Sequence, residues 1–521
     1  MRHYRFPAVG AVYDRARCLI WEYFEFRNLR GHRPRLQCNA PRVIHFFKLL
    51  SILTILATAV PLHAADSALI AAVKKSDSAA VRRLLEQGAS VNSAGTDGTT
   101  ALHWAVESGD AELTRMLLKA GADAKMANRY GMTPLHLAAV NGNSAMMRDL
   151  LDDGADANAV LPEGETALMT AARTGSPECL KLLLDRGAKV DARDKWYGES
   201  ALMWAAAENH GDAVKVLIAH GAPVDSRSTL QKITNRNAGQ SMLSLGNWTP
   251  MMYAARENAL DAGHALVKGG SGLNLTDPDG ATALVIAIIN ANYEFAALLL
   301  DAGADPNIVD NEAGMGALYA VVDMHRLAVG HGRPNPQPVG LMTAVDLAKK
   351  LLEHGADPNR RLKKPILKRH HTAGDSALGE GATPFLRAAK SGDIEMMRAL
   401  VAGGADPKLT MPNGTNALWF AAGLGWRNGS PAAPSYDQGS DEEAVEAIRI
   451  LMALGFDIRA ANDAWDTALH VAISGRGSEA IIKFLIDQGA DPEAKNKRGQ
   501  TPLALATTKG NDTITSLLRK P

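Results

Sequence analysis

The chain has 521 residues, of which 46% are apolar and 21% are charged, and its formal net charge is zero. This length exceeds the size at which one compact core stops growing, so it predicts several domains or a repetitive stack. The balanced charge gives no basic excess that would make nucleic acid the main partner. Cys179 is the one cysteine beyond the N-terminal region, which excludes an intrachain disulfide in the body of the chain.

The N-terminal region has the pattern of an export signal. Residues 43–64 combine a basic approach, an apolar run of twelve residues and a small-residue exit, which is the order of a secretory signal peptide. That run is shorter than the ~20 residues of a membrane span. An uncleaved signal anchor is the alternative, because cleavage after Ala64 places Leu62 where a small residue is preferred. Residues 1–42 are interpreted as an N-terminal extension, either disordered or a wrongly assigned start.

A single motif recurs through residues 65–521. Its copies include TALHWAVESGD (100–110), TPLHLAAVNGN (133–143), TALMTAARTGS (166–176), TPMMYAARENA (249–259), TPFLRAAKSGD (383–393) and TALHVAISGRG (467–477). The motif begins at Ser67, Thr100, Thr133, Thr166, Ser200, Thr249, Thr282, Gly316, Thr383, Asn416, Thr467 and Thr501. Most copies lie 33 or 34 residues apart, and most are followed by a leucine-rich run that ends at glycine. A fixed period of this length is the signature of a repeat architecture.

Each copy predicts a pair of short helices. Thr133 is a good N-cap, Pro134 suits the first helical turn, and Leu135 lies with two alanines on one helical stripe. The leucine-rich run predicts a second amphipathic helix, and Gly154 is expected to adopt left-handed backbone angles at its end. One such pair cannot bury its apolar face alone, so the units must stack.

This pattern resembles the ankyrin repeat family, whose unit of ~33 residues carries a T-P-L-H-x-A signature. The resemblance covers residues 66–521. It implies an all-α ankyrin-repeat solenoid of about twelve helix-turn-helix units, and it implies binding of another protein as the activity. The export signal and the disulfide-free body favour a bacterial-type protein that is exported to the periplasm or outside the cell.

Four intervals are longer than the repeat allows. Residues 226–246 and 360–371 each fall after a second helix, where the family makes a β-hairpin-like finger between units, so they are predicted to be two enlarged fingers. Residues 328–340 and 425–443 each fall between the two helices of one unit and are rich in Pro, Gly and Ser. They are therefore predicted to be inter-helix loops.

The finger at 360–371 is the most basic stretch of the chain. Its cations are Arg360, Arg361, Lys363, Lys364, Lys368 and Arg369. Such a finger would steer association with an acidic protein surface. The alternative is a solvated loop whose cations only keep an extended hairpin soluble.

Aromatic residues are the second candidate for partner binding. On the predicted first helices they are Trp104, Trp204, Tyr253 and Phe420, and near the finger returns they are Trp196, Trp248 and Trp465. Large rigid side chains on a concave face suit protein recognition. The alternative is that they pack against one another between units.

No catalytic, metal or cofactor site is predicted. His370 and His371 would point to opposite faces of a strand, and no C-x-x-C or nucleophile motif occurs. The resemblance implies that His103, His136 and His470 stabilise turns. We therefore expect a non-catalytic scaffold that binds another protein, no cofactor and no nucleic acid. Two alternatives stay open: an enzyme or regulatory subunit with a site at residues 325–380, and a membrane-tethered adaptor if the signal segment is uncleaved.

Overall fold

The computed structural model describes residues 67–230, 246–326, 337–365, 377–425 and 439–519. The predicted extension at 1–42 and the signal segment at 43–64 lie outside these ranges and stay predictions. The described residues form helices joined by turns, with a few isolated bridges and no strand. The prediction of an all-α repeat solenoid is confirmed.

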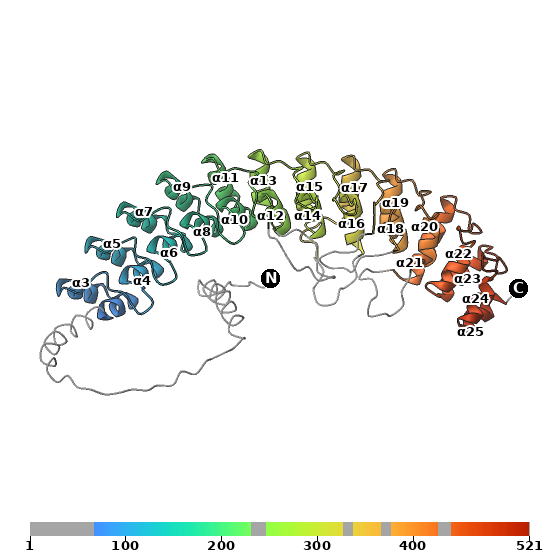
Figure 1. Cartoon of the computed structure of the whole chain (residues 1–521), viewed down its shortest axis with the longest axis horizontal. Coiled ribbons are helices and arrows are strands. Elements are labelled where there is room, and N and C mark those ends of the chain that lie inside the picture. The colour runs from blue at the N-terminus through green and yellow to red at the C-terminus, as the bar shows by residue number, and fades with distance from the viewer. Residues whose placement is uncertain (1–66, 231–245, 327–336, 366–376, 426–438, 520–521) are drawn as a thin grey trace, which may run out of the picture. The chain divides into compact units, whose positions relative to one another are not determined.

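The helices alternate between two rows (Figure 1). The first helix of each unit is, in chain order, residues 67–74, α4 (Ala101–Glu107), α6 (Pro134–Val140), α8 (Ala167–Thr174), α10 (Ala201–Ala207), α12 (Pro250–Glu257), α14 (Ala283–Ile289), α16 (Ala317–His325), α18 (Pro384–Lys390), α20 (Ala417–Ala422), α22 (Ala468–Ser474) and α24 (Pro502–Thr508). The second helix is α3 (Ser78–Glu86), α5 (Ala111–Lys119), α7 (Ser144–Asp152), α9 (Pro177–Asp185), α11 (Gly211–Ala219), α13 (Leu260–Lys268), α15 (Tyr293–Asp301), α17 (Ala344–Glu353), α19 (Ile394–Ala402), α21 (Asp441–Ala453), α23 (Glu479–Asp487) and α25 (Asp512–Leu518). First helices contact the first helices of adjacent units, and second helices contact second helices. One hydrophobic core therefore runs along the stack.

Local sequence explains where the helices begin and end. Thr133 is the N-cap of α6 and Pro134 stands in its first turn, as predicted. Leu135 is buried among the alanines of the same helix, and the small alanine side chains let adjacent first helices approach closely. After α7, Gly154 has φ +90°, which a residue with a side chain rarely adopts.

Asparagine joins the second-helix ends of adjacent units. The Asn307 side chain donates to the carbonyl of Gly355 at 2.8 Å and accepts from the backbone N–H of Asp357 at 2.8 Å. Asn92 and Asn158 make the same pair of bonds to the units that follow them. This joint fixes the distance between successive units, and its sequence signal is the Asn in GADPN-type segments.

The enlarged fingers keep the base of an ordinary finger. In an ordinary finger the N–H of Asn128 donates to the carbonyl of Met132, four residues later. In the enlarged fingers, the N–H of Ser228 donates to the carbonyl of Trp248 and the N–H of Leu362 to that of Ala382, each twenty residues later. The sixteen additional residues therefore lie beyond the base in both cases, and most of them are outside the described residues.

The ends of the inter-helix loops differ in one respect from the prediction. Residues 328–340 fall between α16 and α17 as expected, but residues 441–443 of the loop predicted at 425–443 form the first turn of α21. Ser440 accepts from the N–H of Glu443, and Glu443 accepts from the N–H of Ser440. This reciprocal capping starts the helix early because three acidic residues fill its first turn.

Candidate partner-binding surface

Adjacent fingers are joined by single backbone hydrogen bonds. Lys195 N–H donates to the Glu163 carbonyl at 2.7 Å, and Lys363 N–H donates to the Ala313 carbonyl at 2.7 Å. The second of these bonds attaches the basic finger to the preceding one. The finger row is therefore a continuous edge, and the basic finger is part of it at least as far as Lys363.

The described cations of the basic finger have acceptors within the protein. Lys364 lies 3.1 Å from Glu312, and Arg360 lies 3.7 Å from Asp357. Arg361 donates to the carbonyl of Thr410 at 2.7 Å. All three side chains and that of Lys363 are exposed. Lys368 and Arg369 lie outside the described residues, so their part in the predicted site stays a prediction.

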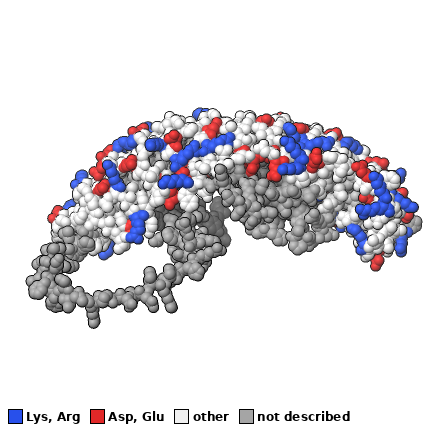
Figure 2. Space-filling model, viewed as in Figure 1, with Lys and Arg blue, Asp and Glu red and all other residues white. Residues whose placement is uncertain are grey.

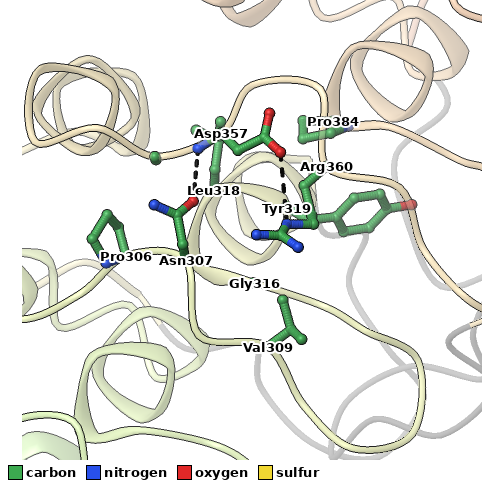
Figure 3. Close-up of a pocket in the computed structure, with 10 residues that line it drawn as sticks. Pro306, Asn307, Val309, Gly316, Leu318, Tyr319, Asp357, Arg360 and Pro384 are labelled. Atoms are coloured by element: carbon green, nitrogen blue, oxygen red, sulfur yellow. Dashed lines mark hydrogen bonds and ion pairs between the residues drawn. The ribbon is translucent and has the colours of Figure 1, made fainter.

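Figure 3 shows the recess that lies beside Arg360. Asn307 and Asp357 face the recess, and the Asn307 side chain accepts a hydrogen bond from the backbone N–H of Asp357. Arg360 lies at one side of the recess and forms an ion pair with Asp357. Tyr319 and Pro384 line the remainder with apolar surface. Because these polar groups are paired with one another, we assign the recess to the joint between two units.

Aromatic residues of the first helices are covered by cations from the preceding unit. Lys74 lies 3.8 Å from the ring centroid of Trp104, and Arg173 lies 4.9 Å from that of Trp204. Lys390 lies in the same way 5.4 Å from Phe420, which is buried. In each pair the aromatic residue stands four positions after the start of its own motif. The cation stands seven positions after the start of the motif in the preceding unit. This recurrence supports packing between units, the alternative that the sequence left open.

Trp248 and Tyr253 form a buried pair at the base of the first enlarged finger. Their ring centroids are 5.6 Å apart with the planes at 68°, and Arg256 lies over both rings. Burial raises the pKa of Tyr253. Burial also raises the pKa of the neighbouring Glu199, an effect that the Tyr253 hydroxyl partly offsets. Both rings thus anchor the finger rather than lie at the surface.

Two of the predicted aromatic residues are exposed. Trp196 is 50% exposed and Trp465 is 58% exposed, and both lie in fingers. Tyr197, which the sequence places beside Trp196 at the same finger return, is exposed as well, and the structure adds Tyr130 in the same row of fingers. Tyr130 was missed by the sequence prediction, although its place three residues before the motif start at Thr133 was a usable signal. The structure therefore places the exposed aromatic surface on the fingers.

A partly buried polar cluster, absent from the sequence prediction, joins three successive units. We call it the polar clamp, and it consists of Asp323, His325, Arg326, Arg387, Asp393 and Glu443. Arg387 is 1% exposed and lies 2.7 Å from Asp323. His325 lies 2.7 Å from Asp393, and Arg326 lies 2.6 Å from Glu443. The last pair joins the α16 unit to the α21 unit across the α18 unit, whereas solenoid units ordinarily contact only their neighbours.

The histidines of the described residues make separate local contacts. His103 bonds Thr100 at 2.8 Å and the carbonyl of Met132 at 3.0 Å, which ties a first helix to the next finger. His354 lies 3.6 Å from Asp301 in the second-helix row, remote in the fold from the first-helix His325. His370 and His371 lie outside the described residues. Within the described ranges, no group of His, Cys, Asp and Glu side chains is arranged to hold a metal ion.

Charges of both signs are interspersed over the face of the stack in Figure 2. Single surface ion pairs such as Lys215 with Asp212 and Lys483 with Asp487 account for part of this pattern. Among the described residues, no helix has the length and apolar content that a membrane crossing requires. The described part of the face that Figure 2 shows therefore carries no large field of one sign.

The stacked helix pairs, capped first helices and joined fingers define a repeat scaffold. The model for ankyrin repeats (3 copies) matches residues 69–160, 135–228, 226–310 and 439–521, and the model for a single ankyrin repeat matches residues 380–411. These matches cover more than half of the chain, so the chain belongs to the ankyrin repeat family.

Two curated relatives show how widely this scaffold is used. The chain is 35% identical to Inversin of Danio rerio over 79 residues, which is 15% of this chain and 8% of that protein. It is 25% identical to the E3 ubiquitin-protein ligase KEG of Arabidopsis thaliana over 326 residues, which is 56% of this chain and 18% of that protein. The chain thus spans less than a fifth of the length of each of these relatives.

Proposed function

We propose that this chain is a non-catalytic scaffold that binds another protein through its fingers and the concave face formed by its first helices. Ankyrin repeats are in general protein–protein interaction modules. The observation that carries the proposal is the exposure of Tyr130, Trp196 and Trp465 on fingers that a rigid stack holds in place. Aromatic side chains held in this way bury a large area at a small entropic cost.

The basic finger adds electrostatic steering to this proposal. Arg361 donates to a neutral carbonyl, so its charge is not cancelled by the bond. Lys364 and Arg360 each pair with an exposed carboxylate, and exposed ion pairs of this kind contribute little free energy. A protein with an acidic surface is the partner that this finger would favour.

Affinity capture from the source cell tests the proposal. The chain is compared with the double variant Trp196→Ser/Trp465→Ser, and with a Val339→Ser variant that removes an exposed but smaller apolar side chain outside the fingers. We expect the double variant to lose a specific bound protein while its melting temperature stays unchanged, and the Val339 variant to keep it. Capture of the same proteins by the chain and the double variant would contradict the proposal.

Export of the chain is part of the proposal and rests on residues 43–64. Mass spectrometry of the native N-terminus is expected to find Ala65 as the first residue. A retained segment would instead support the membrane-tethered adaptor.

An enzyme or regulatory subunit with a site at residues 325–380 is the second candidate. The contact between His325 and the buried Asp393 is its supporting observation, because a carboxylate can orient an imidazole for proton transfer. Asp393 also accepts from the N–H of Met396 as the N-cap of α19, which gives the pair a structural use. If His325→Asn abolishes an activity of the chain while the fold persists, this candidate replaces the scaffold.

A further inference from the structure

The exposed apolar residues of the described chain gather on neighbouring fingers near its N-terminal end. Five of the eight exposed large hydrophobic residues are Tyr130, Val160, Trp196, Tyr197 and Leu230. They lie in four consecutive fingers. We call the tips of these fingers the aromatic strip.

Direct contacts make the strip continuous. Lys195 N–H bonds the carbonyl of Glu163, and Thr229 N–H bonds that of Tyr197 at 2.6 Å. Gly131 approaches Pro162 so closely that an added Cβ would lie 2.7 Å from the proline ring. Tyr130 directly precedes Gly131 and therefore stands beside the next finger. An extended chain laid along this edge would meet successive side chains of the strip in order.

The cations beside the strip bond neutral groups. Arg193 donates to the carbonyl oxygens of Gly198 and Arg227 at 2.7 and 2.6 Å, and the Lys195 ammonium donates to the carbonyl of Pro162 at 3.0 Å. Arg129 donates to the carbonyl of Thr96.

These bonds hold the side chains in place without neutralising them. In the described part of the chain, Arg129, Arg193 and Lys195 form no ion pair within 4.0 Å. Glu163 and the buried Asp194 are acidic residues of the same fingers, and Asp97 interacts electrostatically with Arg129, so these cations do not form a field of one sign. The cations of the basic finger differ, since Lys364 and Arg360 each face a carboxylate.

We propose that the aromatic strip binds an extended segment of a partner protein in which apolar and acidic side chains alternate. The inference rests on the proposed scaffold function and names the partner chemistry for one of its surfaces. Exposed rings and Leu230 bury the apolar side chains, and fixed cations meet the acidic ones. Basic residues beside aromatic ones also suit single-stranded nucleic acid. The protein segment is favoured because its acidic side chains can be spaced to avoid Glu163, whereas a nucleic-acid strand carries a negative charge at every nucleotide and would meet that carboxylate.

Fluorescence anisotropy with a labelled peptide of three Glu-Leu-Asp-Phe repeats tests the proposal on the full chain. Trp196→Ser should weaken binding by about tenfold or more, and Lys195→Glu by about threefold or more, with a larger effect at low salt. Lys497→Glu is the matched charge control, because Lys497 makes the same backbone bond, to Ala464, in another finger. Leu341→Ser is the matched apolar control, because Leu341 is exposed between α16 and α17, outside the fingers. Both controls should bind as the unchanged chain does, and circular dichroism should show all variants folded.

Several results would overturn the inference. They are no saturable binding of the peptide, equal binding of a peptide with Lys in place of Glu and Asp, equal losses in the control variants, or tighter binding of a twelve-nucleotide thymidine strand. None of these outcomes touches the scaffold proposal, which the captured partner and the Trp196/Trp465 double variant decide separately.

Discussion

Lowering the pH from 7 to 5 is expected to destabilise the unit that contains His136. This imidazole is buried within the stack and bonds Thr133 at 2.8 Å. Burial lowers its pKa from 6.5 to about 4, and the carbonyl of Glu165 partly opposes the shift. In the unfolded chain the group titrates near its ordinary pKa, so between pH 6.5 and 4 the unfolded state binds more protons. The contribution of neutral His136 to the free energy of unfolding is therefore complete above pH 6.5 and is lost as the pH falls toward 4.

The pKa difference sets the size of the effect. For groups with a pKa of 6.5 unfolded and about 4 folded, the free energy of unfolding falls by about 2 kcal/mol between pH 7 and 5. Hydrogen exchange of the α6 amides, corrected for the intrinsic effect of pH on exchange, reports the local free energy. His136→Met is the control, because Met169 and Met203 occupy the same motif position in the next two units.

The comparison isolates one titration from all others. Every other ionisable group is the same in the chain and in the His136→Met variant, so the contributions of those groups to the pH dependence cancel in the comparison. We expect the chain to lose about 2 kcal/mol more local stability than the variant on acidification. Equal losses would refute the reasoning, as would an NMR titration that places the pKa of His136 above 6.

Three further predictions concern the polar clamp and one finger. Arg387→Met leaves Asp323 buried without its closest cation and should lower the local free energy of unfolding by about 3–5 kcal/mol. Adding Asp323→Leu should recover most of this loss. Hydrogen exchange of the α16 and α18 amides measures the free energy, and additive losses in the double variant would contradict the prediction. Arg326→Ala and Glu443→Ala should show a coupling of about 0.5 kcal/mol in a double-mutant cycle, where a stack coupled only between neighbours gives none. Gly198→Ala should lower the stability of the protein by about 1 kcal/mol or more, because Gly198 has φ +62° and an added Cβ would clash with the Thr229 hydroxyl. An unchanged melting temperature would contradict this prediction and would show that the finger backbone adjusts to the added methyl group.

Much of the fold could be predicted from the sequence because one motif recurs along the chain. The N-cap at Thr133, the proline that follows it and the left-handed Gly154 depend on local backbone chemistry, which recurs wherever the motif recurs. The site of each enlarged finger also followed from counting. The excess of sixteen residues reappears as the longer separation between Ser228 and Trp248 at the finger base.

Tertiary structure decided which of the predicted aromatic residues reach the surface. Trp196 and Tyr253 both looked like contact residues in the sequence, yet Trp196 is half-exposed and Tyr253 is buried against Trp248. Periodicity assigns a side chain to a helix or finger, but its burial depends on what the neighbouring unit places against it. Arg326 and Glu443 are the clearest case. They are 117 positions apart in the sequence, and they form an ion pair because the tertiary structure brings the α16 and α21 units together across the α18 unit.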